Sequence, residues 1–226
     1  MQLGDHRVSS TDDLPGSPDR LVEGCCYHNG VGDSGNNPFK GHLQTIFLDR
    51  DGVLNEKMPE GRWVATWEEF HVLPGVPEAI ARLNDAGLRV IVVSNQRGIA
   101  LGMVSLADVE AIQLRFEDLL AEQGARVDAF YVCPHDRLEC NCRKPLPGMF
   151  LQAQREFPEI SATSSVMFGD SVADIEFGRR LGMLTVLIDG DADRQAPGIE
   201  DARKLADLRY ASFAKAVDAL LQSRNQ

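Results

Sequence analysis

The chain has 226 residues, of which 43% are hydrophobic and 25% are charged, and its formal net charge is −11. This length suits one α/β domain with a sizeable core and is too short for two large ones. The negative charge argues against nonspecific binding to nucleic acid or to an anionic membrane. No apolar run is long enough to span a membrane and no signal peptide is recognisable, so we expect a cytoplasmic protein. We expect it to act as a monomer on a small molecule.

Residues 1–40 differ in composition from the rest of the chain. They are rich in Gly, Ser, Asp, Asn and Pro and lack a periodic apolar pattern, which is typical of loops or disorder. Cys25, Cys26 and His28 do not suggest a metal site, because adjacent cysteines give poor tetrahedral geometry and no second ligand pair follows. We therefore predict an unstructured tail over residues 1–40 and one folded domain over residues 41–226.

Within that domain, short apolar runs alternate with segments of helical periodicity. The runs predict buried strands, while N-cap residues and glycines mark helix ends. This alternation favours a three-layer α/β/α fold with a doubly wound parallel sheet. Between the first strand and the first helix, the aromatic residues Trp63, Trp67 and Phe70 suggest a β-hairpin-like flap that covers a functional site. The alternative is that these aromatic side chains pack in the core. The predicted strands are 45–48, 89–93, 129–132, 165–168 and 184–188, and the predicted helices are 76–84, 106–122, 148–157, 172–181 and 211–221.

Two carboxylates follow the first predicted strand. Asp49 comes directly after it, and Asp51 and Gly52 follow in what reads as a sharp turn. Most such pairs are only a polar strand end, but the carboxyl ends of parallel strands form the crevice where open α/β sheets bind ligands. The pair suits phosphoryl transfer, with Asp49 as the nucleophile that forms an aspartyl phosphate. Asp51 would protonate the leaving alkoxide and then deprotonate the attacking water.

Polar residues also follow three other predicted strands. Because two carboxylates repel a phosphate, the site needs a divalent cation, and Mg²⁺ is the hard, oxygen-seeking choice. Asp170 is a further carboxylate suited to Mg²⁺, and Asp174 lies one helical turn later. Ser94 and Asn95 can each hold a phosphate oxygen, and Lys144 can neutralise the phosphate and orient the nucleophile. Each has a plain reading as a turn or surface residue, but their shared position at strand ends favours one site.

The chain carries four motifs, D-R-D-G-V, S-N-Q, R-K-P and G-D-S-V-A-D, that resemble those of the haloacid dehalogenase superfamily. The resemblance runs from Leu43 to near Gly190. It implies that Asp49 and Asp170 bind Mg²⁺ through their side chains and Asp51 through its backbone carbonyl. Members that dehalogenate lack the second acid, so the resemblance implies a phosphatase. The intervals between the motifs are too short for a separate cap domain, and we expect an open site.

A cluster of cysteines precedes the R-K-P motif. Cys133, His135, Cys140 and Cys142 have the spacing of a Cys₃His site, which makes a closed, four-coordinate structural Zn²⁺ centre. The alternative is a hydrophobic pocket of unliganded cysteines, which the polar residues of this loop disfavour. Zinc would brace a short loop that has too little apolar area to order itself.

The cysteine loop joined to C-R-K-P-L-P-G-M resembles the D-glycero-D-manno-heptose 1,7-bisphosphate 7-phosphatase family, and the related histidinol-phosphatases share such a loop. The segment N-Q-R-G-I-A-L-G also resembles the heptose enzymes more closely. Ser171 departs from that family, where a lysine follows G-D, and this removes one phosphate contact. The resemblance implies a phosphosugar held by Ser94, Asn95, Gln96, Arg97, Arg143 and Lys144.

We expect hydrolysis of the heptose 1,7-bisphosphate to the 1-phosphate. Histidinol-phosphate phosphatase is the alternative. A polynucleotide 3′-phosphatase is disfavoured by the net charge of −11 and the lack of a basic stripe. A non-catalytic protein with the same fold is disfavoured because Asp49, Asp51, Lys144 and Asp170 are all present.

Overall fold

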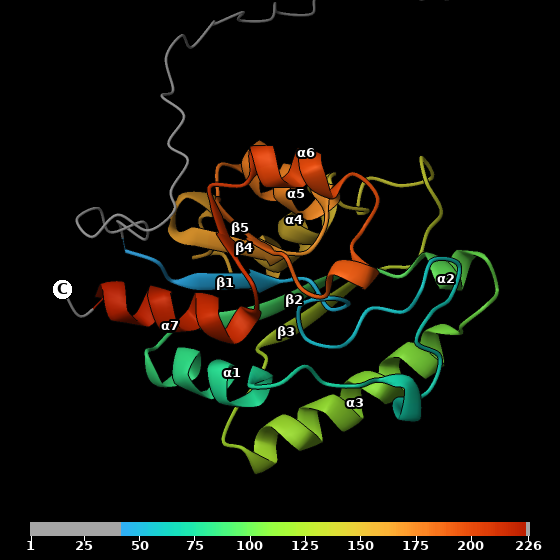
Figure 1. Ribbon diagram of the computed structural model, residues 1–226, viewed down its shortest axis with the longest axis horizontal. Helices are drawn as coiled ribbons and strands as arrows, with labels where there is room; N and C mark the ends of the chain where they lie inside the picture. The colour runs from blue at the N-terminus through green and yellow to red at the C-terminus, as the bar shows by residue number, and fades with distance from the viewer. Residues whose placement is uncertain (1–41, 225–226) are drawn as a thin grey trace, which may run out of the picture. The chain divides into compact units, whose positions relative to one another are not determined.

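The computed structural model describes residues 42–224 (Figure 1). The predictions made for residues 1–40 lie outside this range. In the described part, six strands form one sheet in the order β3-β2-β1-β4-β5-β6, and every pair of neighbours is parallel. The strands are β1 (Thr45–Leu48), β2 (Arg89–Asn95), β3 (Ala129–Cys133), β4 (Ser165–Gly169), β5 (Leu184–Ile188) and β6 (Leu208–Tyr210).

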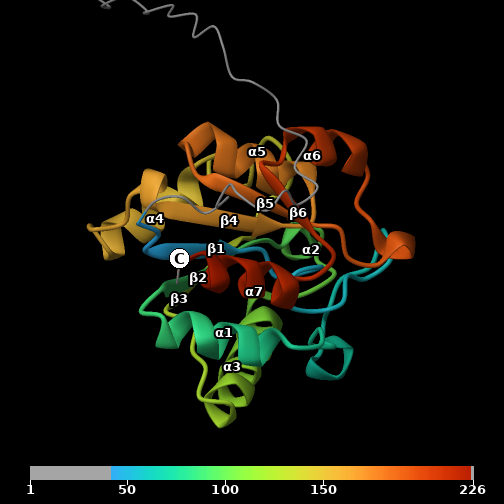
Figure 2. The same ribbon diagram turned by 60° about the vertical axis from the view of Figure 1, so that its left-hand side comes forward.

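Helices cover both faces of this sheet, as Figures 1 and 2 show. One face carries α1, α3 and α7, and the other carries α4, α5 and α6. The expected three-layer α/β/α arrangement is confirmed. The helices are α1 (Val76–Asp85), α2 (Arg97–Ala100), α3 (Leu106–Glu122), α4 (Gly148–Glu156), α5 (Val172–Leu181), α6 (Ile199–Leu205) and α7 (Phe213–Arg224).

Strand β1 lies at the centre of the sheet and is buried along its whole length. Its side chains alternate between the faces, so Ile46 and Leu48 join the core under α1, α3 and α7, while Phe47 joins the core under α4 and α5. The chain winds from β1 to β2 and β3, then returns to β4 on the other side of β1. The switch point of the sheet therefore lies between β1 and β4, where such folds bind ligands.

Local signals explain where several helices begin and end. Ser105 caps α3, because its hydroxyl accepts from the backbone N–H of Asp108 at 3.1 Å while the Asp108 carboxylate accepts from the backbone N–H of Ser105 at 2.9 Å. Gly182 ends α5 in the left-handed conformation with φ of 83°. The sequence predicted both of these ends.

Other parts of the fold differ from the prediction. The segment between β1 and α1 is no β-hairpin, and its regular structure is a 3₁₀ turn, η1 (Trp67–Glu69), with an isolated bridge between Asn55 and Val72. Phe70 is buried there. The short elements α2, α6 and β6 were not predicted. Further 3₁₀ turns are η2 (Ala162–Ser164) and η3 (Ala192–Arg194).

The intervals between the motifs hold only elements of the α/β domain. Among the described residues, the interval from Asp51 to Ser94 contains η1, α1 and most of β2, and the interval from Lys144 to Asp170 contains α4, η2 and β4. The prediction that no separate cap domain is present is thus confirmed for this part of the chain. None of the described helices is long and apolar enough to cross a membrane.

Candidate active site

Three carboxylates meet at the switch point of the sheet. Asp49 follows β1, Asp170 follows β4, and Asp174 lies in the first turn of α5. The β1–β4 register pairs Leu48 with Phe168, and the backbone N–H of Asp49 donates to the carbonyl of Phe168 at 2.9 Å. Carboxylate oxygens of the three aspartates lie within 4.8 Å of one another. The parallel register thus brings together acids that are far apart in the sequence.

Lys144 lies between two of these acids. Its Nζ is 2.7 Å from Asp49 Oδ1 and 2.6 Å from Asp174 Oδ1, and it also donates to the backbone carbonyl of Val93 at 2.6 Å. The Lys144 side chain is only 1% exposed. Burial acts to lower the pKa of Lys144, but the charges of Asp174 and Asp49 outweigh it and raise the pKa to about 12. This lysine therefore carries a fixed positive charge next to the expected nucleophile.

The cluster still holds more negative charge than its buried position favours. Desolvation, helped by the charge of Asp174, raises the pKa of Asp49 to about 6. Desolvation also raises the pKa of Asp170 to about 7, although the Lys57 charge acts to lower it. Such shifts mean that the ionised carboxylates lack sufficient positive charge around them.

The arrangement fits a hard divalent cation. Asp170 Oδ1 is buried and has no hydrogen-bond partner among the described residues, so a donor or cation is missing at that atom. Gly52 packs against the other oxygen of this carboxylate, because a Cβ at this position would clash with Asp170 Oδ2. Mg²⁺ suits an all-oxygen set of this kind, with water completing its coordination.

Asp51 lies apart from the three clustered carboxylates. Its carboxylate accepts hydrogen bonds from Arg50 Nη2 at 3.0 Å, from Asn55 Nδ2 at 3.0 Å and from Gln96 Nε2 at 2.9 Å. Burial acts to raise the pKa of Asp51, but the Arg50 charge and these hydrogen bonds lower it overall. In this arrangement Asp51 is an ionised acceptor, and it must leave Arg50 before it can donate a proton.

The S-N-Q motif connects the end of β2 to the loop that carries Lys144. The side-chain amide of Asn95 forms two hydrogen bonds with the backbone of Lys144. Asn95 Nδ2 donates to the Lys144 carbonyl at 3.1 Å, and the Lys144 N–H donates to Asn95 Oδ1 at 2.9 Å. Gln96 Nε2 donates to the buried Ser94 hydroxyl at 2.8 Å. In this state Asn95 and Gln96 position Lys144 and Asp51, and their predicted contact with a phosphate stays a prediction.

An open basin lies in front of these groups. Its cavity volume is about 440 Å³, which is within the usual range of small-molecule sites. Arg143 lines it, and its Nη1 is buried without a hydrogen-bond partner in the described structure. Arg97 also lines the basin, and its Nε pairs with Asp136 at 2.5 Å. The basin therefore combines an acidic floor with cationic walls.

The predicted zinc ligands come together in one cluster. Ligand atoms of Cys133, His135, Cys140 and Cys142 lie within 4.8 Å of one another. Cys133 Sγ is 3.5 Å from Cys140 Sγ, Cys142 Sγ is 3.3 Å from His135 Nδ1, and these cysteines form no disulfide. Zn–S bonds of about 2.3 Å in a tetrahedron require sulfur atoms this close together. The geometry thus fits a Zn²⁺ ion held by three cysteines and one histidine.

Several contacts of the site were not predicted from the sequence. Lys57 Nζ is 2.6 Å from Asp170 Oδ2, although a lysine in a polar loop gives no signal of such a contact. Trp63 packs so closely on Gly98 that a Cβ there would lie 2.7 Å from the indole. Ser171 caps α5, and its hydroxyl donates to Asp174 Oδ2 at 2.5 Å. The serine that departs from the family pattern therefore orients one acid of the cluster.

Comparison with known proteins supports the interpretation of this geometry. The chain is 39% identical over 142 residues to the D-glycero-alpha-D-manno-heptose-1,7-bisphosphate 7-phosphatase of Mycobacterium bovis, covering 62% of this chain and 74% of the relative. It is 42% identical over 147 residues to the D-glycero-beta-D-manno-heptose-1,7-bisphosphate 7-phosphatase of Pseudomonas putida, covering 65% and 82%. The crystal structure of D,D-heptose 1,7-bisphosphate phosphatase from B. bronchiseptica, complexed with magnesium and phosphate, is similar with a TM-score of 0.70 and 31% identity. That likeness covers 80% of this chain and 99% of the other.

Residues 50–182 match the haloacid dehalogenase-like hydrolases, and the chain belongs to this family. The family and the phosphatase relatives together support the narrower class of phosphoric monoester hydrolases. The predicted superfamily and fold class are confirmed.

Proposed function

We propose that this enzyme is a Mg²⁺-dependent phosphatase that converts D-glycero-D-manno-heptose 1,7-bisphosphate to the 1-phosphate. The observation that carries the proposal is the Asp49–Lys144 pair beside Asp170, at the floor of a basin lined by Arg143, whose buried Nη1 has no hydrogen-bond partner among the described residues. Relatives named as heptose bisphosphate phosphatases support the same substrate class.

In this proposal Asp49 is the nucleophile. Lys144 holds Asp49 Oδ1, so the other carboxylate oxygen can attack phosphorus in line. Asp49, Asp170 and the Asp51 backbone carbonyl would hold Mg²⁺, which when bound offsets negative charge on the phosphate. Attack on phosphorus breaks the bond to the sugar oxygen and leaves the phosphoryl group on Asp49.

Asp51 has two proton transfers in the same proposal. It protonates the departing sugar oxygen and then takes a proton from the water that hydrolyses the aspartyl phosphate. Both steps require its carboxylate to leave the hydrogen bonds with Arg50 and Gln96. These donors therefore stabilise a resting position of Asp51.

The substrate preference follows from the shape and charge of the basin. The 7-phosphate is a primary ester on a flexible arm, which reaches the floor of an open site easily. The anomeric phosphate would remain near the wall, where the Arg143 guanidinium can bind it with two parallel hydrogen bonds. This remote contact helps to orient the reacting end, so monophosphates should react less efficiently.

We also propose that Zn²⁺ occupies the cysteine cluster. Its role is structural, because all four ligands come from the protein and none is left for substrate. The ion would fix the loop that enters the basin at Arg143 and Lys144.

The test measures kcat/KM for the heptose bisphosphate, in both anomeric forms, and for histidinol phosphate. Arg143→Ala should lower kcat/KM for the bisphosphate about a hundredfold and affect a simple aryl phosphate much less. Arg155→Ala is the control, because Arg155 is an exposed residue of α4. If histidinol phosphate is the better substrate, or if Arg143→Ala slows all substrates equally, the heptose assignment is wrong.

A further inference from the structure

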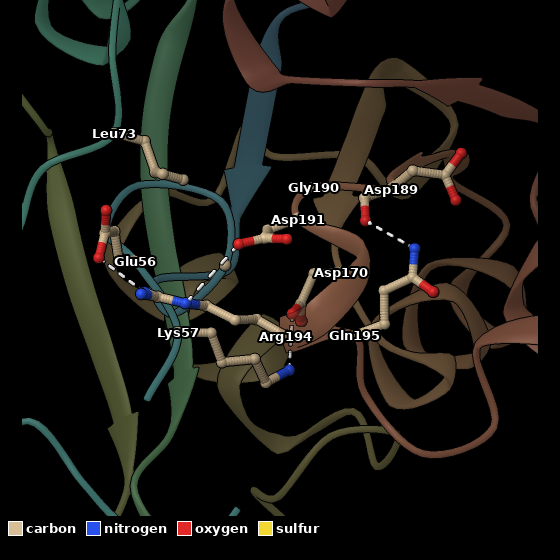
Figure 3. A pocket seen from close by; sticks show the side chains of 10 residues that line it. Glu56, Lys57, Leu73, Asp170, Asp189, Gly190, Asp191, Arg194 and Gln195 are labelled. Atoms are coloured by element: carbon tan, nitrogen blue, oxygen red, sulfur yellow. Dashed lines mark hydrogen bonds and ion pairs between the residues drawn. The ribbon is translucent and has the colours of Figure 1, made fainter. Parts of the chain in front are cut away.

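Lys57 contacts a carboxylate of the cluster that Lys144 does not pair with. Its Nζ lies 2.6 Å from Asp170 Oδ2, and its side chain is 27% exposed. Figure 3 shows the ammonium group directed at the Asp170 carboxylate. Nothing in the function proposed above uses this residue.

The backbone on the N-terminal side of Lys57 is held from two directions. The backbone N–H of Glu56 donates to the carbonyl of His71 at 2.8 Å. The Glu56 carboxylate accepts from Arg194 Nη1 at 2.6 Å, and Arg194 belongs to η3 in the β5–α6 connection. Figure 3 shows Arg194 reaching from that connection to Glu56. The contact between Lys57 and Asp170 is therefore supported by a second ion pair next to it.

The two oxygens of Asp170 have different surroundings. Oδ2 faces Lys57, whereas Oδ1 is buried and without a hydrogen-bond partner in the described part of the chain. A divalent cation bound by this carboxylate would lie close to the Lys57 ammonium. Two positive charges at such a distance repel each other, and the repulsion is stronger where they are partly shielded from water. Lys57 therefore disfavours the metal that the rest of the cluster favours.

Lys57 also has access to the substrate basin. It lines the basin together with Asp49 and Arg143, and it lines the smaller pocket beside Glu56 and Arg194 as well. Lys57 therefore borders both spaces. A lysine freed from Asp170 has a long, flexible stem and can bind an anion on the basin side.

We propose that Lys57 is a built-in cation that competes with the divalent metal at Asp170 and, once the metal is bound, binds a phosphate oxygen in the basin. The inference rests on the proposed phosphatase function and adds a residue to it. It predicts opposite effects of Lys57 on the two ligands, because the same charge repels a cation and attracts an anion.

The experiment is isothermal titration calorimetry of the full chain, first with Mg²⁺ alone and then with inorganic phosphate at saturating Mg²⁺. Lys57→Met keeps the apolar stem and removes the charge, Lys57→Gln is a second neutral variant, and Lys57→Arg keeps the charge. Lys215→Met is the control, because Lys215 is an exposed residue of α7. Circular dichroism checks that each variant is folded.

Both neutral variants should bind Mg²⁺ about tenfold more tightly than the wild type and bind phosphate several-fold more weakly. Lys57→Arg and Lys215→Met should stay close to the wild type for both ligands. Unchanged or weaker Mg²⁺ binding in the folded neutral variants would overturn the competition, and unchanged phosphate binding would overturn the anion contact. Failure of the wild type itself to bind Mg²⁺ would contradict the proposed function as well, so the two failures are distinguishable.

Discussion

The carboxylate cluster and the cysteine loop are both suited to a metal, but they are built in different ways. Asp49, Asp170 and Lys144 are buried residues placed by the ends of β1 and β4 and by the hydrogen bonds of Asn95. The cysteine loop has a buried Cys133 at its start, but Leu138 near its middle is fully exposed and adopts a positive φ of 65°. Very little apolar area holds that loop in place.

The difference separates two uses of a metal ion. At the carboxylate cluster the sheet and its cores fix the side chains, so a metal adds chemistry to a frame that already exists. At the cysteine loop an ion would supply the order itself, because binding energy replaces the missing apolar core. Removing the two metals should therefore have different consequences for folding and for activity.

The largest effect is expected at the nucleophile. Asp49→Asn should reduce phosphate release by a factor on the order of 10⁴ or more, since removal of a nucleophile leaves only binding and electrostatic contributions. The variant should remain folded, and its melting temperature without metal should rise slightly because a buried charge is gone. Steady-state kinetics and thermal unfolding measure these effects, with the exposed Asp193→Asn as a control. Substantial remaining activity would exclude the aspartyl-phosphate mechanism.

A smaller loss of activity is expected at the cysteine loop, together with a loss of order. Cys140→Ser should release zinc, lower activity about 10- to 100-fold and make the chain near Leu138 sensitive to protease. Elemental analysis should find about one zinc per chain in the wild type and much less in this variant. Cys26→Ser, which changes a cysteine outside the described residues, should retain the metal. Wild-type protein that contains no zinc when freshly prepared and reduced would contradict the structural role.

The last effect concerns stability and its dependence on pH, with no loss of activity. Asp49 and Asp170 have folded-state pKa values of about 6 and about 7, above their ordinary value of 3.8, chiefly because of burial. The folded state therefore holds protons that the unfolded state has lost. Metal-free protein should lose stability as the pH rises from about 5 to about 7, above the range in which carboxylates with lowered pKa values, such as Asp51 and Asp136, ionise. Mg²⁺ favours the ionised carboxylates and should flatten this decline. Thermal unfolding across this range, with and without Mg²⁺, measures it, and stability that rises with pH without metal would be the contrary result.

Most of the fold could be predicted from local sequence signals. β1 and β5 have the predicted bounds, because short apolar runs between turn residues leave little choice of conformation. The short β6 and α6 were missed because their apolar residues are too few to show a period. The hairpin was wrong, and the alternative of core packing holds for Phe70, which is buried and stacks on Trp67, while Trp63 packs against Gly98.

The site could be predicted only in outline. Acids at strand ends were identifiable because parallel strands bring those ends together. The spacing of the cysteines and the histidine predicted that they form a separate cluster. The partners of these groups were not identifiable. Lys57 and Asp170 are separated by 113 residues, and no periodicity predicts their contact. The hydrogen bonds from Arg50 and Gln96 to Asp51 depend on side-chain directions that the sequence does not specify.

The central claim is that Asp49 carries the phosphoryl group, and Asp51→Asn with an aryl phosphate tests it most directly. An aryl leaving group needs no proton, so Asp49 can still be phosphorylated, while hydrolysis lacks its base. We predict a rapid burst of the phenol, about one per enzyme chain, followed by a stall. Acid quenching and peptide mass spectrometry should then find the phosphoryl group on Asp49. Steady release without a burst, or a phosphoryl group on any other residue, would contradict the account.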